Sequence, residues 1–317
     1  MSSKPRKSAL LFLLFALVFV TLPRAQETTA TTSEAAGTST PPALPPTNDP
    51  KEIIRRAMQL DQHNFDMSRN YTYEERRVVK ALDKHGNEKH KQIETLDWTI
   101  LYGEPYSRLT QKDDKPLSEK DEKKEQEKVD KFIDKRKNED ERDREKRLEK
   151  MEKERRQERA FDADVVNAYD FRIVNEEQVN GRDNFVIEAI PRKDFHPTQP
   201  HADMLTKVKG RVWIDKQDYG LTKLQAETVD TLSFGLFIAR IHKGALLTYE
   251  QTLINNEVWL PSKVAVNGGA RIMLLMNGDV AMQSDYSNYK KFTTGIRILP
   301  GVKEVEPGSR PPSQPNQ

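Results

Sequence analysis

The chain contains no cysteine among its 317 residues. This absence excludes disulfide bonds, a thiol nucleophile and cysteine-ligated metal centres, and we also expect no lipid anchor on an N-terminal cysteine. An exported protein without disulfides has to be stabilised by its own core, which favours a bacterial periplasm over a eukaryotic extracellular space.

Sequence motifs of the commonest enzyme classes are missing as well. There is no Gly-x-Ser-x-Gly nucleophile elbow, no Walker loop and no dinucleotide-binding glycine motif. His196, His201 and Asp203 could share a metal ion, but neither a His-Glu-x-x-His helix nor a cysteine supports such a site. We therefore expect no catalytic residues, no metal site and no other cofactor.

An excess of one charge is missing too, since 52 basic residues face 50 acidic ones. The first 25 residues carry four of the basic ones, an apolar run over residues 9–22 and the small residue Ala25. This order is typical of a secretory signal peptide, and the apolar run is shorter than the roughly 20 residues that span a membrane. We expect cleavage after Ala25, with an uncleaved anchor as the alternative. The mature net charge is then near −2 (2 − 4), which gives no support for nucleic-acid binding.

The two ends of the mature chain have little apolar surface. Residues 26–48 are mostly Thr, Ser, Ala and Pro, and residues 300–317 are rich in Pro. Such segments cannot bury enough apolar surface to offset the conformational entropy that is lost when a chain becomes ordered. We therefore expect a disordered linker and a disordered tail.

Ordered structure is expected to begin at Asp49. This acid is a typical helix N-cap, and Pro50 fits the first helical position. Apolar residues then recur at helical spacing, which predicts an amphipathic helix of about four turns that needs a surface to lie on. Strand patterns over residues 71–82 and 88–101 complete the segment 49–111.

Residues 112–160 differ in character from the rest of the chain. Of these 49 residues, 19 are basic and 18 acidic, and acid-before-base pairs recur at a spacing of four. Each pair adds only about 0.2–0.5 kcal/mol to an isolated helix, but they are numerous. Ser118 and Asp121 form a capping box at the start, and Asn138 is a weak point in the middle. We expect a charged helical insertion of one or two helices, with disorder as the alternative.

Strand patterns dominate from Phe161 to residue 299. We expect strands near residues 169–178, 183–191, 207–215, 221–230, 244–255, 258–267, 270–276 and 279–292. Asn180-Gly181 and Asn277-Gly278 are dipeptides typical of tight hairpins. Successive strands joined by short turns indicate an antiparallel meander rather than alternating strands and helices.

The segment GRVWIDKQDYGLTKL at residues 210–224 contains the acid pair Asp215 and Asp218. A catalytic carboxylate pair would need a second group that converges from elsewhere, and no motif nominates one. Asp and Gly between two alternating runs are typical of turns, because Asp accepts hydrogen bonds from its own backbone and Gly tolerates positive φ. We therefore interpret the pair as part of a hairpin turn.

The segment LSFGLFIARI at residues 232–241 is too apolar for an ordinary loop. It is either a short core helix or strand, or an apolar lid over the open mouth of a curved sheet. Both interpretations require other apolar groups to cover it.

Several segments together carry a resemblance. A capped helix precedes a tyrosine-rich strand, a Gly turn leads into a strand, an Asp-Lys turn joins two strands, and a later turn leads into a Trp-Leu-Pro strand. These features lie in DPKEIIRRAMQ (49–59), YTYEERRVV (71–79), NEEQVNGRDNFVIEAIPR (175–192), GRVWIDKQDYGLTKL (210–224) and NNEVWLPSKV (255–264). Their order resembles the lipoprotein-sorting superfamily of periplasmic lipoprotein carriers, outer-membrane lipoprotein receptors and envelope sensors, over residues 50–110 and 162–293.

The resemblance implies an α+β fold: a strongly curved antiparallel sheet, or open half-barrel, with helices on its concave side and the charged segment as an insertion. It also implies an apolar cavity that holds acyl chains of lipoproteins or other lipids. The candidate lipid-binding residues are Phe185, Ile187, Trp213, Phe234, Phe237, Trp259, Val264 and Val266.

The expected function is that of a periplasmic lipid- or lipoprotein-binding protein of a Gram-negative-type bacterium, acting in outer-membrane lipoprotein sorting without enzymatic chemistry. Its expected partners are acyl chains; we expect no nucleic acid and no stable transmembrane span after signal cleavage. The alternative is a non-enzymatic envelope interaction or scaffold protein whose charged arm, residues 112–160, binds another envelope protein.

Overall fold

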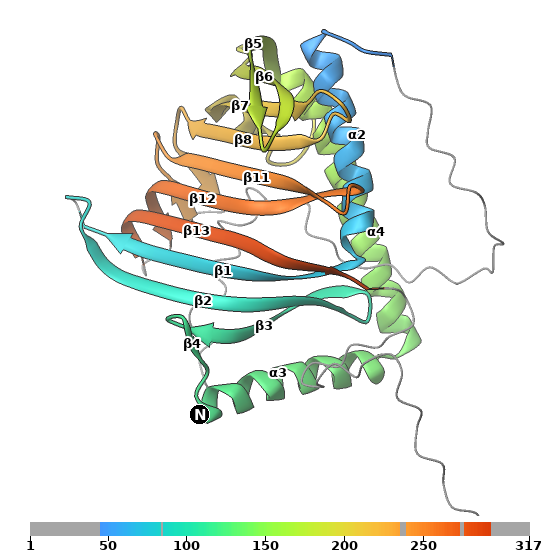
Figure 1. The fold of residues 1–317 in the computed structure, drawn as a ribbon, viewed down its shortest axis with the longest axis vertical. Helices are drawn as coiled ribbons and strands as arrows, with labels where there is room; N and C mark the ends of the chain where they lie inside the picture. Colours follow the sequence, from blue (N-terminus) through green and yellow to red (C-terminus); the bar gives the residue numbers. More distant parts are fainter. Residues whose placement is uncertain (1–44, 84, 235–238, 273–275, 293–317) are drawn as a thin grey trace, which may run out of the picture.

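A computed structural model describes residues 45–83, 85–234, 239–272 and 276–292. The expected export signal (1–25), most of the linker and the tail (300–317) lie outside these residues. The described residues form one antiparallel sheet of 13 strands, which bends toward the side occupied by two helices and does not close on itself (Figure 1). The expected α+β open half-barrel is therefore present.

The sheet is a meander in which sequence neighbours mostly pair. Its order is β4-β3-β2-β1-β13-β12-β11-β8-β7-β6-β5, and the short hairpin β9–β10 is attached to β12. The strands are β1 (Tyr71–Leu82), β2 (Glu88–Leu101), β3 (Glu104–Lys112), β4 (Lys115–Pro116), β5 (Tyr169–Val179), β6 (Arg182–Pro191), β7 (Val208–Asp215), β8 (Leu221–Thr228), β9 (Leu232–Phe234), β10 (Ala239–Ile241), β11 (Leu246–Ile254), β12 (Val258–Ile272) and β13 (Met276–Lys291).

Most strand predictions are confirmed, and the differences are local. β12 runs without interruption through Gly268-Gly269, where two strands were expected. β3 and β4 were not expected. In the apolar segment 232–241 the strand alternative is confirmed at both ends by β9 and β10, while residues 235–238 lie outside the described part of the chain.

The bend of the sheet coincides with irregular pairing. Register shifts occur in β1, β5, β7 and β11, among other strands. An extra residue in one strand of a pair bends that strand and increases its twist. The sheet therefore presents a concave face, and the helices lie on it.

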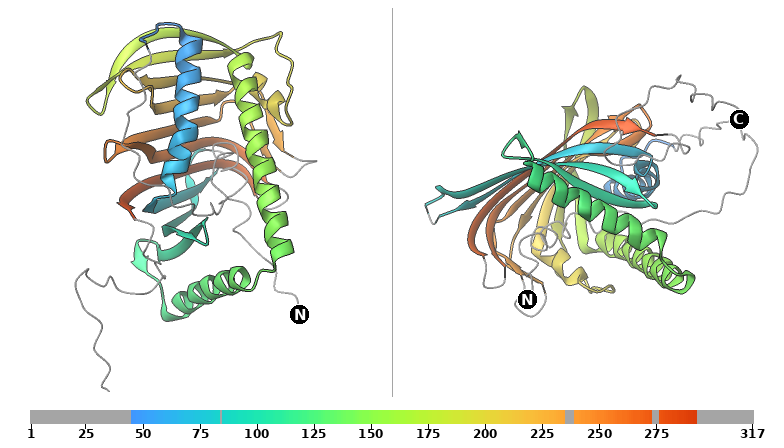
Figure 2. Two further views of the ribbon diagram at one scale, coloured as in Figure 1. Left: turned by 90° about the vertical axis from the view of Figure 1, so that its right-hand side faces the viewer. Right: turned by 90° about the horizontal axis from the view of Figure 1, so that it is seen from below.

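Helix α2 (Pro50–Ser68) begins as the sequence predicts. The side chain of Asp49 accepts a hydrogen bond from the backbone N–H two residues later at 3.0 Å, which satisfies one free donor at the helix start. Ile53, Ile54 and Ala57 are buried against the sheet. Burial of each large apolar side chain contributes about 1.5–3 kcal/mol. Figure 2 shows α2 and α4 side by side, crossing the strands on the same face.

The charged segment forms two helices, α3 (Glu119–Lys137) and α4 (Glu141–Ala168). Ser118 caps α3 by accepting from the Asp121 N–H at 3.2 Å, and Asn138 ends it. α4 extends beyond residue 160, where the strand region was expected to begin, because the apolar residues of its last turns pack against the sheet and η1 (Ala202–Lys207). Tertiary burial here outweighs the strand-like pattern.

The corner between α3 and α4 is fixed to the start of β3 by buried charges. Glu104 accepts from Arg136 Nη2 at 2.9 Å and from Arg147 Nη1 at 3.0 Å. Glu139 binds the same two guanidinium groups at 3.1 and 2.7 Å. The charged segment therefore lies against the sheet edge (Figure 1), and α4 returns across the concave face instead of extending away as a free arm.

Candidate functional site

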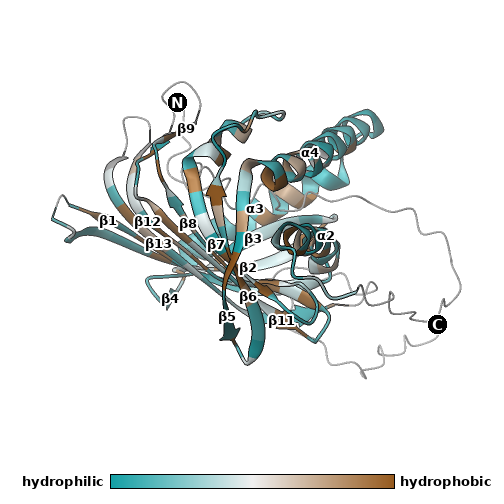
Figure 3. Ribbon diagram, turned by 90° about the horizontal axis from the view of Figure 1, so that it is seen from above, coloured by the Kyte–Doolittle hydropathy of each residue, from teal (hydrophilic) through white to brown (hydrophobic). Residues whose placement is uncertain are grey.

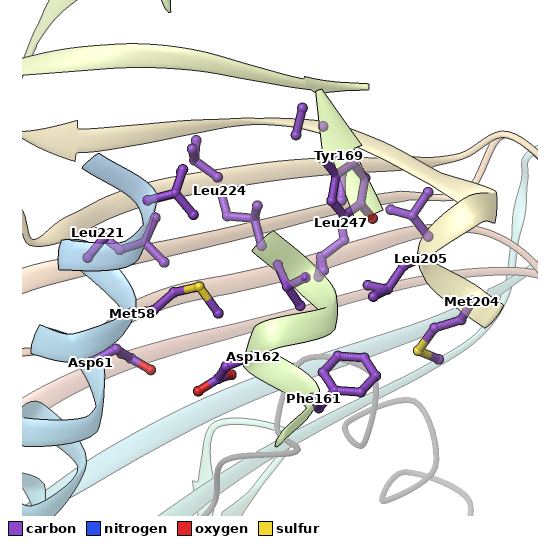
Figure 4. Close-up of a pocket in the computed structure, with 18 of the residues that line it drawn as sticks. Met58, Asp61, Phe161, Asp162, Tyr169, Met204, Leu205, Leu221, Leu224 and Leu247 are labelled. Carbon is purple, nitrogen blue, oxygen red and sulfur yellow. The ribbon is translucent and has the colours of Figure 1, made fainter. Parts of the chain in front are cut away.

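A cavity of about 520 Å³ lies between the concave face of the sheet and the helices α2 and α4. Figure 4 shows side chains from the helices and the strands pointing into the same space. In Figure 3, apolar residues colour much of the sheet next to these helices, whereas most of α4 is hydrophilic. The volume falls within the range of about 300–1,000 Å³ that is typical of small-molecule sites.

The lining is apolar over most of its surface. The helices α2 and α4 contribute Ile54, Ala57, Met58, Phe65, Phe161 and Val165. The η1 segment and the strands contribute Tyr169, Phe171, Met204, Leu205, Val208, Val212, Ile214, Leu221, Leu224, Leu232, Ile241, Leu247 and Val266, among others. Such a lining favours a hydrocarbon group, because moving apolar surface out of water is favourable.

The space is vacant because small residues occupy the middle of this part of the sheet. Ala189, Gly210 and Ala226 form a continuous row across β6, β7 and β8, since Gly210 pairs with both alanines. All three line the cavity. Protein interiors are normally close-packed, so a row without large side chains leaves room that the helices above do not fill.

The cavity reaches the surface of the protein. Gln62 and Arg159, on the two helices, are exposed and belong to the lining. Lys209 and Leu246, at the other side, are exposed as well, and Leu246 retains 52% of its surface. A ligand therefore has access to the interior.

Three acids line the cavity: Asp61 and Asp66 of α2, and Asp162 of α4. Figure 4 shows Asp61 of α2 and Asp162 of α4 with their carboxyl groups directed toward the gap between the helices. Burial raises the pKa of Asp61 to about 6, the Asp162 carboxyl adds to the rise, and a hydrogen bond from Gln251 opposes it. Burial also raises the pKa of Asp162, against a 2.9 Å hydrogen bond from Gln62 Nε2. The pair is therefore easier to protonate than ordinary surface acids.

A smaller cavity of about 80 Å³ adjoins the larger one, since Asp61 and Phe65 line both. Its other walls include Tyr71, Tyr73, Trp98, Tyr249, Gln251, Trp259 and Tyr289. Gln251 is only 3% exposed, and its Nε2 donates to Tyr249 Oη at 2.8 Å. Its Oε1 atom has no hydrogen-bond partner among the residues that the structure describes. The smaller cavity is thus aromatic, with an unsatisfied acceptor in its wall.

The acid pair of GRVWIDKQDYGLTKL forms the turn between β7 and β8, and the hairpin interpretation is confirmed. Asp215 is fully buried and accepts two hydrogen bonds from the Arg182 guanidinium, at 2.7 and 2.8 Å. Burial alone would raise the pKa of Asp215, but Arg182 and two backbone N–H groups outweigh it and hold this pKa below its usual value. Asp218 contacts Arg182 and the Trp259 indole at 3.1 and 3.2 Å. These contacts fix the turn.

Gly220 makes this turn compatible with its neighbour. A Cβ atom at this position would lie 2.1 Å from Nε1 of Trp259. Only glycine leaves room for the indole to pack on the hairpin. Asp215, Asp218 and Gly220 therefore serve the structure of the turn, and none of them lines the larger cavity.

Four of the candidate lipid-binding residues lie on the concave face. Phe185 and Ile187 are buried in the cluster beneath α2. Val266 lines the larger cavity. Val264, two residues before it on β12, is buried in the neighbouring cluster of apolar and tyrosine side chains. The structure thus brings Val266 to the cavity itself and the other three to its surroundings.

The remaining candidates lie elsewhere. Trp259 lines the smaller cavity. Trp213 lies on the convex face, because it alternates with cavity-lining neighbours in β7, and its indole N–H donates to an acid of β5 at 2.8 Å. Phe237 and the side chain of Phe234 fall outside the described part of the structure.

The contribution of the helices and the acid pair was missed from the sequence. Asp61 follows Ala57 by four positions and Ile54 by seven, so it continues the buried stripe of α2. An acid on an apolar stripe is a signal that the sequence does contain. Phe161 and Asp162 gave no such signal, because the pattern from residue 161 predicts strands.

Within the part of the chain that the structure describes, no group of three or more His, Asp or Glu side chains is arranged to hold a metal ion. His201 precedes η1 and Asp203 lies within it. None of the described helices combines the length and the apolarity needed to cross a bilayer.

Comparison with solved structures finds similar folds at low sequence identity. An outer membrane lipoprotein-sorting protein domain from Vibrio parahaemolyticus is 12% identical, covers 77% of this chain and 95% of its own, and gives a TM-score of 0.31. A LolA superfamily protein from Nitrosomonas europaea is 12% identical over 79% of this chain and 94% of its own, with a TM-score of 0.27. A DUF1329 family protein from Desulfovibrio piger is 15% identical, covers 79% of this chain and 96% of its own, and gives a TM-score of 0.27.

No family model matches the chain, and no curated protein matches it. These structural matches concern the fold alone. Function has to be inferred from the cavity.

Proposed function

We propose that the protein binds lipids by enclosing an acyl chain in the cavity between the sheet and the helices α2 and α4, without covalent chemistry. The observation that carries this proposal is an apolar cavity of about 520 Å³ that reaches the surface. Each CH₂ group that leaves water contributes about 0.8 kcal/mol, so a chain of about twelve carbons gains roughly 10 kcal/mol before the costs of association.

The chemistry of the lining supports the same proposal. The cavity reaches the surface, so a ligand would replace water that lies against apolar side chains. A lining of aliphatic and aromatic side chains offers few polar partners to water and suits hydrocarbon better.

The test measures binding of a neutral alkyl chain to the mature protein. N-phenyl-1-naphthylamine, an uncharged probe that fluoresces when buried, is expected to bind saturably and to be displaced by 1-dodecanol. Ala226→Phe fills the row of small residues and should weaken binding at least about tenfold. Gln225→Phe, the exposed next residue on the opposite face of β8, should leave binding unchanged.

Val266→Phe narrows the same cavity from β12 and serves as a second variant if Ala226→Phe does not fold. Absence of saturable binding in the unmodified protein would overturn the proposal. Equal affinities in the cavity variants and the Gln225 variant would overturn it as well, because the probe would then bind elsewhere.

We further propose that this binding occurs in the periplasm and serves the transport of lipids or of lipoprotein acyl chains, as in outer-membrane lipoprotein sorting. The support is the signal-peptide pattern of residues 1–25 and the resemblance carried by the sequence segments. Fractionation of a Gram-negative-type host should recover a mature protein that starts at Gln26 in the periplasmic fraction. Retention of the full chain in the cytoplasm would contradict this assignment.

A further inference from the structure

Asp61 lines both cavities, whereas Asp162 lines the larger one and Gln251 the smaller one. Asp61 and Asp162 face the gap between α2 and α4 (Figure 4). The described residues give them hydrogen bonds from the side-chain amides of Gln251 and Gln62, and no ion pair. A carboxylate has about four acceptor sites, so most of this capacity is left for a ligand.

Among the described residues, no Lys or Arg is a cause of the pKa shift of Asp61. Its pKa responds to burial, to Asp162 and to Gln251. Tyr249, on the sheet below, is a neutral neighbour whose own pKa is raised by burial and by Asp61. Burial of an acid without a counter-charge is unfavourable for its ionised form. Arg69 lines the smaller cavity as well, but it follows Asp61 by eight residues, which is about 12 Å along the axis of α2, and it is not among the causes of the Asp61 pKa shift.

The basic residues that line the larger cavity have partners of their own. Arg159 Nη2 lies 3.4 Å from Glu152 Oε1, and Lys209 Nζ lies 3.0 Å from Glu227 Oε2. Both cations are exposed at the rim. The uncompensated charge of the lining is thus negative.

An independent observation comes from the smaller cavity. Gln251 is 3% exposed and lines this cavity, yet no group in the described part of the chain forms a hydrogen bond with its Oε1 atom. The Nε2 atom of this amide donates to Tyr249 Oη, and the pKa of Asp61 reflects a hydrogen bond from the same side chain. A buried acceptor without a partner costs about 1–3 kcal/mol in general, and a donor supplied by a ligand removes that cost.

We propose that the ligand of this cavity is an amphiphile whose polar end is a hydrogen-bond-donating cation, such as an alkylammonium group. Its chain lies in the larger cavity, and its cation lies among Asp61, Asp162 and Gln251. The inference rests on the lipid binding proposed above and adds the chemical class of the ligand.

Size and charge both fit an ammonium group. Water takes about 30 Å³ in the liquid, so a cavity of about 80 Å³ has room for an end group of a few heavy atoms. An ammonium offers three donors and one positive charge, which matches two carboxylates and an amide oxygen. A carboxylate end group would bring a third negative charge to the same place and would be rejected.

The test compares three probes of equal chain length: dodecylamine, 1-dodecanol and dodecanoate. Each displaces N-phenyl-1-naphthylamine from the mature protein at pH 8, where the Asp61 carboxyl is ionised and an alkylamine is still protonated, as lysine is. The amine is expected to bind at least about tenfold more tightly than the alcohol, and dodecanoate more weakly than both. At pH 5, below the pKa of Asp61, the preference for the amine should shrink.

Variants separate the charge preference from chain binding. Asp61→Asn and Asp162→Asn should each lower the preference for the amine about threefold or more while affinity for the alcohol is kept. Glu52→Gln removes one negative charge from the same helix away from the cavity and should change neither quantity.

The outcomes distinguish the inferred ligand class from the lipid binding on which it rests. Equal binding of the three probes, or an unchanged preference for the amine in the double variant of Asp61 and Asp162, overturns the ligand class and leaves lipid binding intact. Tighter binding of dodecanoate also overturns it and assigns the polar end to the cations of the two linings, Arg69, Arg159 and Lys209. Failure of all three probes overturns lipid binding itself.

Discussion

Two regions of the curved sheet differ in how far their own side chains fill its concave face. The hollow half, which comprises β5–β8 and the adjoining parts of β11 and β12, carries small and aliphatic residues and encloses the cavity. The filled half, around β1, β2 and β13, is occupied largely by its own aromatic rings, which leave room for the smaller cavity of about 80 Å³. The ring of Tyr73 stacks on Trp98 with centroids 5.8 Å apart. The ring centroids of Tyr286 and Tyr289 lie 5.9 and 5.3 Å from that of Tyr73. Side-chain size on one face, rather than the strand arrangement, decides whether a half-barrel is hollow.

The acids of the two halves differ in the same way. In the filled half, Glu75 is fully buried and receives hydrogen bonds from Arg77 at 2.7 and 2.8 Å, and from Trp98 and Ser284 at 2.8 and 2.7 Å. In the hollow half, Asp61 faces open space and receives a hydrogen bond from an amide. A buried acid with a cation and a full set of donors belongs to a core, whereas an acid without them is available to a ligand.

The largest effect is expected from breaking the core of the filled half. Glu75→Ala leaves the nearly buried Arg77 guanidinium without its counter-charge and should destabilise the protein by about 3–5 kcal/mol in urea unfolding. Glu74 precedes Glu75 and lies on the opposite face of β1. The substitution Glu74→Ala should lower the free energy of unfolding by less than about 1 kcal/mol. Similar losses in the two variants would show that the Glu75 network does not hold this half together.

A slightly smaller effect is expected at the β7–β8 turn, the structural acid site of the hollow half. Asp215→Ala should cost about 2–4 kcal/mol, because Arg182 loses a buried partner. Since the pKa of Asp215 is lowered in the folded state, its contribution is present above the unfolded value of about 3.9 and is lost as the pH falls through the folded value. Denaturation at pH 7 and pH 3 checks this, and a loss of equal size at both values would contradict it.

The comparison itself is tested by placing the same larger side chain in each half. Ser284→Leu adds volume to a fully packed site and removes a hydrogen bond to Glu75, so we expect a loss of about 2–3 kcal/mol. Ala226→Leu extends into the cavity and should change the free energy of unfolding by less than about 1 kcal/mol. Equal costs at the two positions would mean that the hollow half is not hollow in solution.

The smallest effect concerns Asp61 and depends on pH. An acid whose pKa rises to about 6 on folding binds its proton more tightly in the folded state, so stability falls as the pH rises from about 4 to 6. Asp61→Asn should therefore stabilise the protein by about 1–2 kcal/mol at pH 8, with allowance for solvent screening, and leave it unchanged at pH 4. Melting temperatures at both pH values measure this, and a destabilised variant at pH 8 would contradict the unpaired state of Asp61.

Much of the fold could be predicted where the signal is local. The cap at Asp49, the apolar stripe of α2 and the limits of β1 and β2 follow from neighbouring residues, and the structure confirms them. β3 was missed because Pro105 near its start reads as a break. This proline is tolerated close to the sheet edge, where β3 pairs with β2 and the two-residue β4.

Less of the site could be predicted. Strand alternation places every second residue on one face but does not say which face is concave, so Trp213 and Val266 were equal candidates. In the structure, only Val266 of these two lines the cavity. The last turns of α4 were read as strand, and with them the positions of Phe161 and Asp162 were lost.

The sequence by itself determined the start of α2, the limits of β1 and β2, the tight turns and the preference of the charged segment for helices, because these depend on caps, periodicity and turn residues close together in the chain. Only the tertiary structure decided that the sheet is hollow on one side and that Asp61 and Asp162 meet across the gap. The physical reason is that a cavity is defined by the space that distant side chains fail to fill. Ala57 of α2, Val165 of α4 and Ala226 of β8 line it together. These residues are far apart in the chain, so no local sequence pattern predicts the space between them.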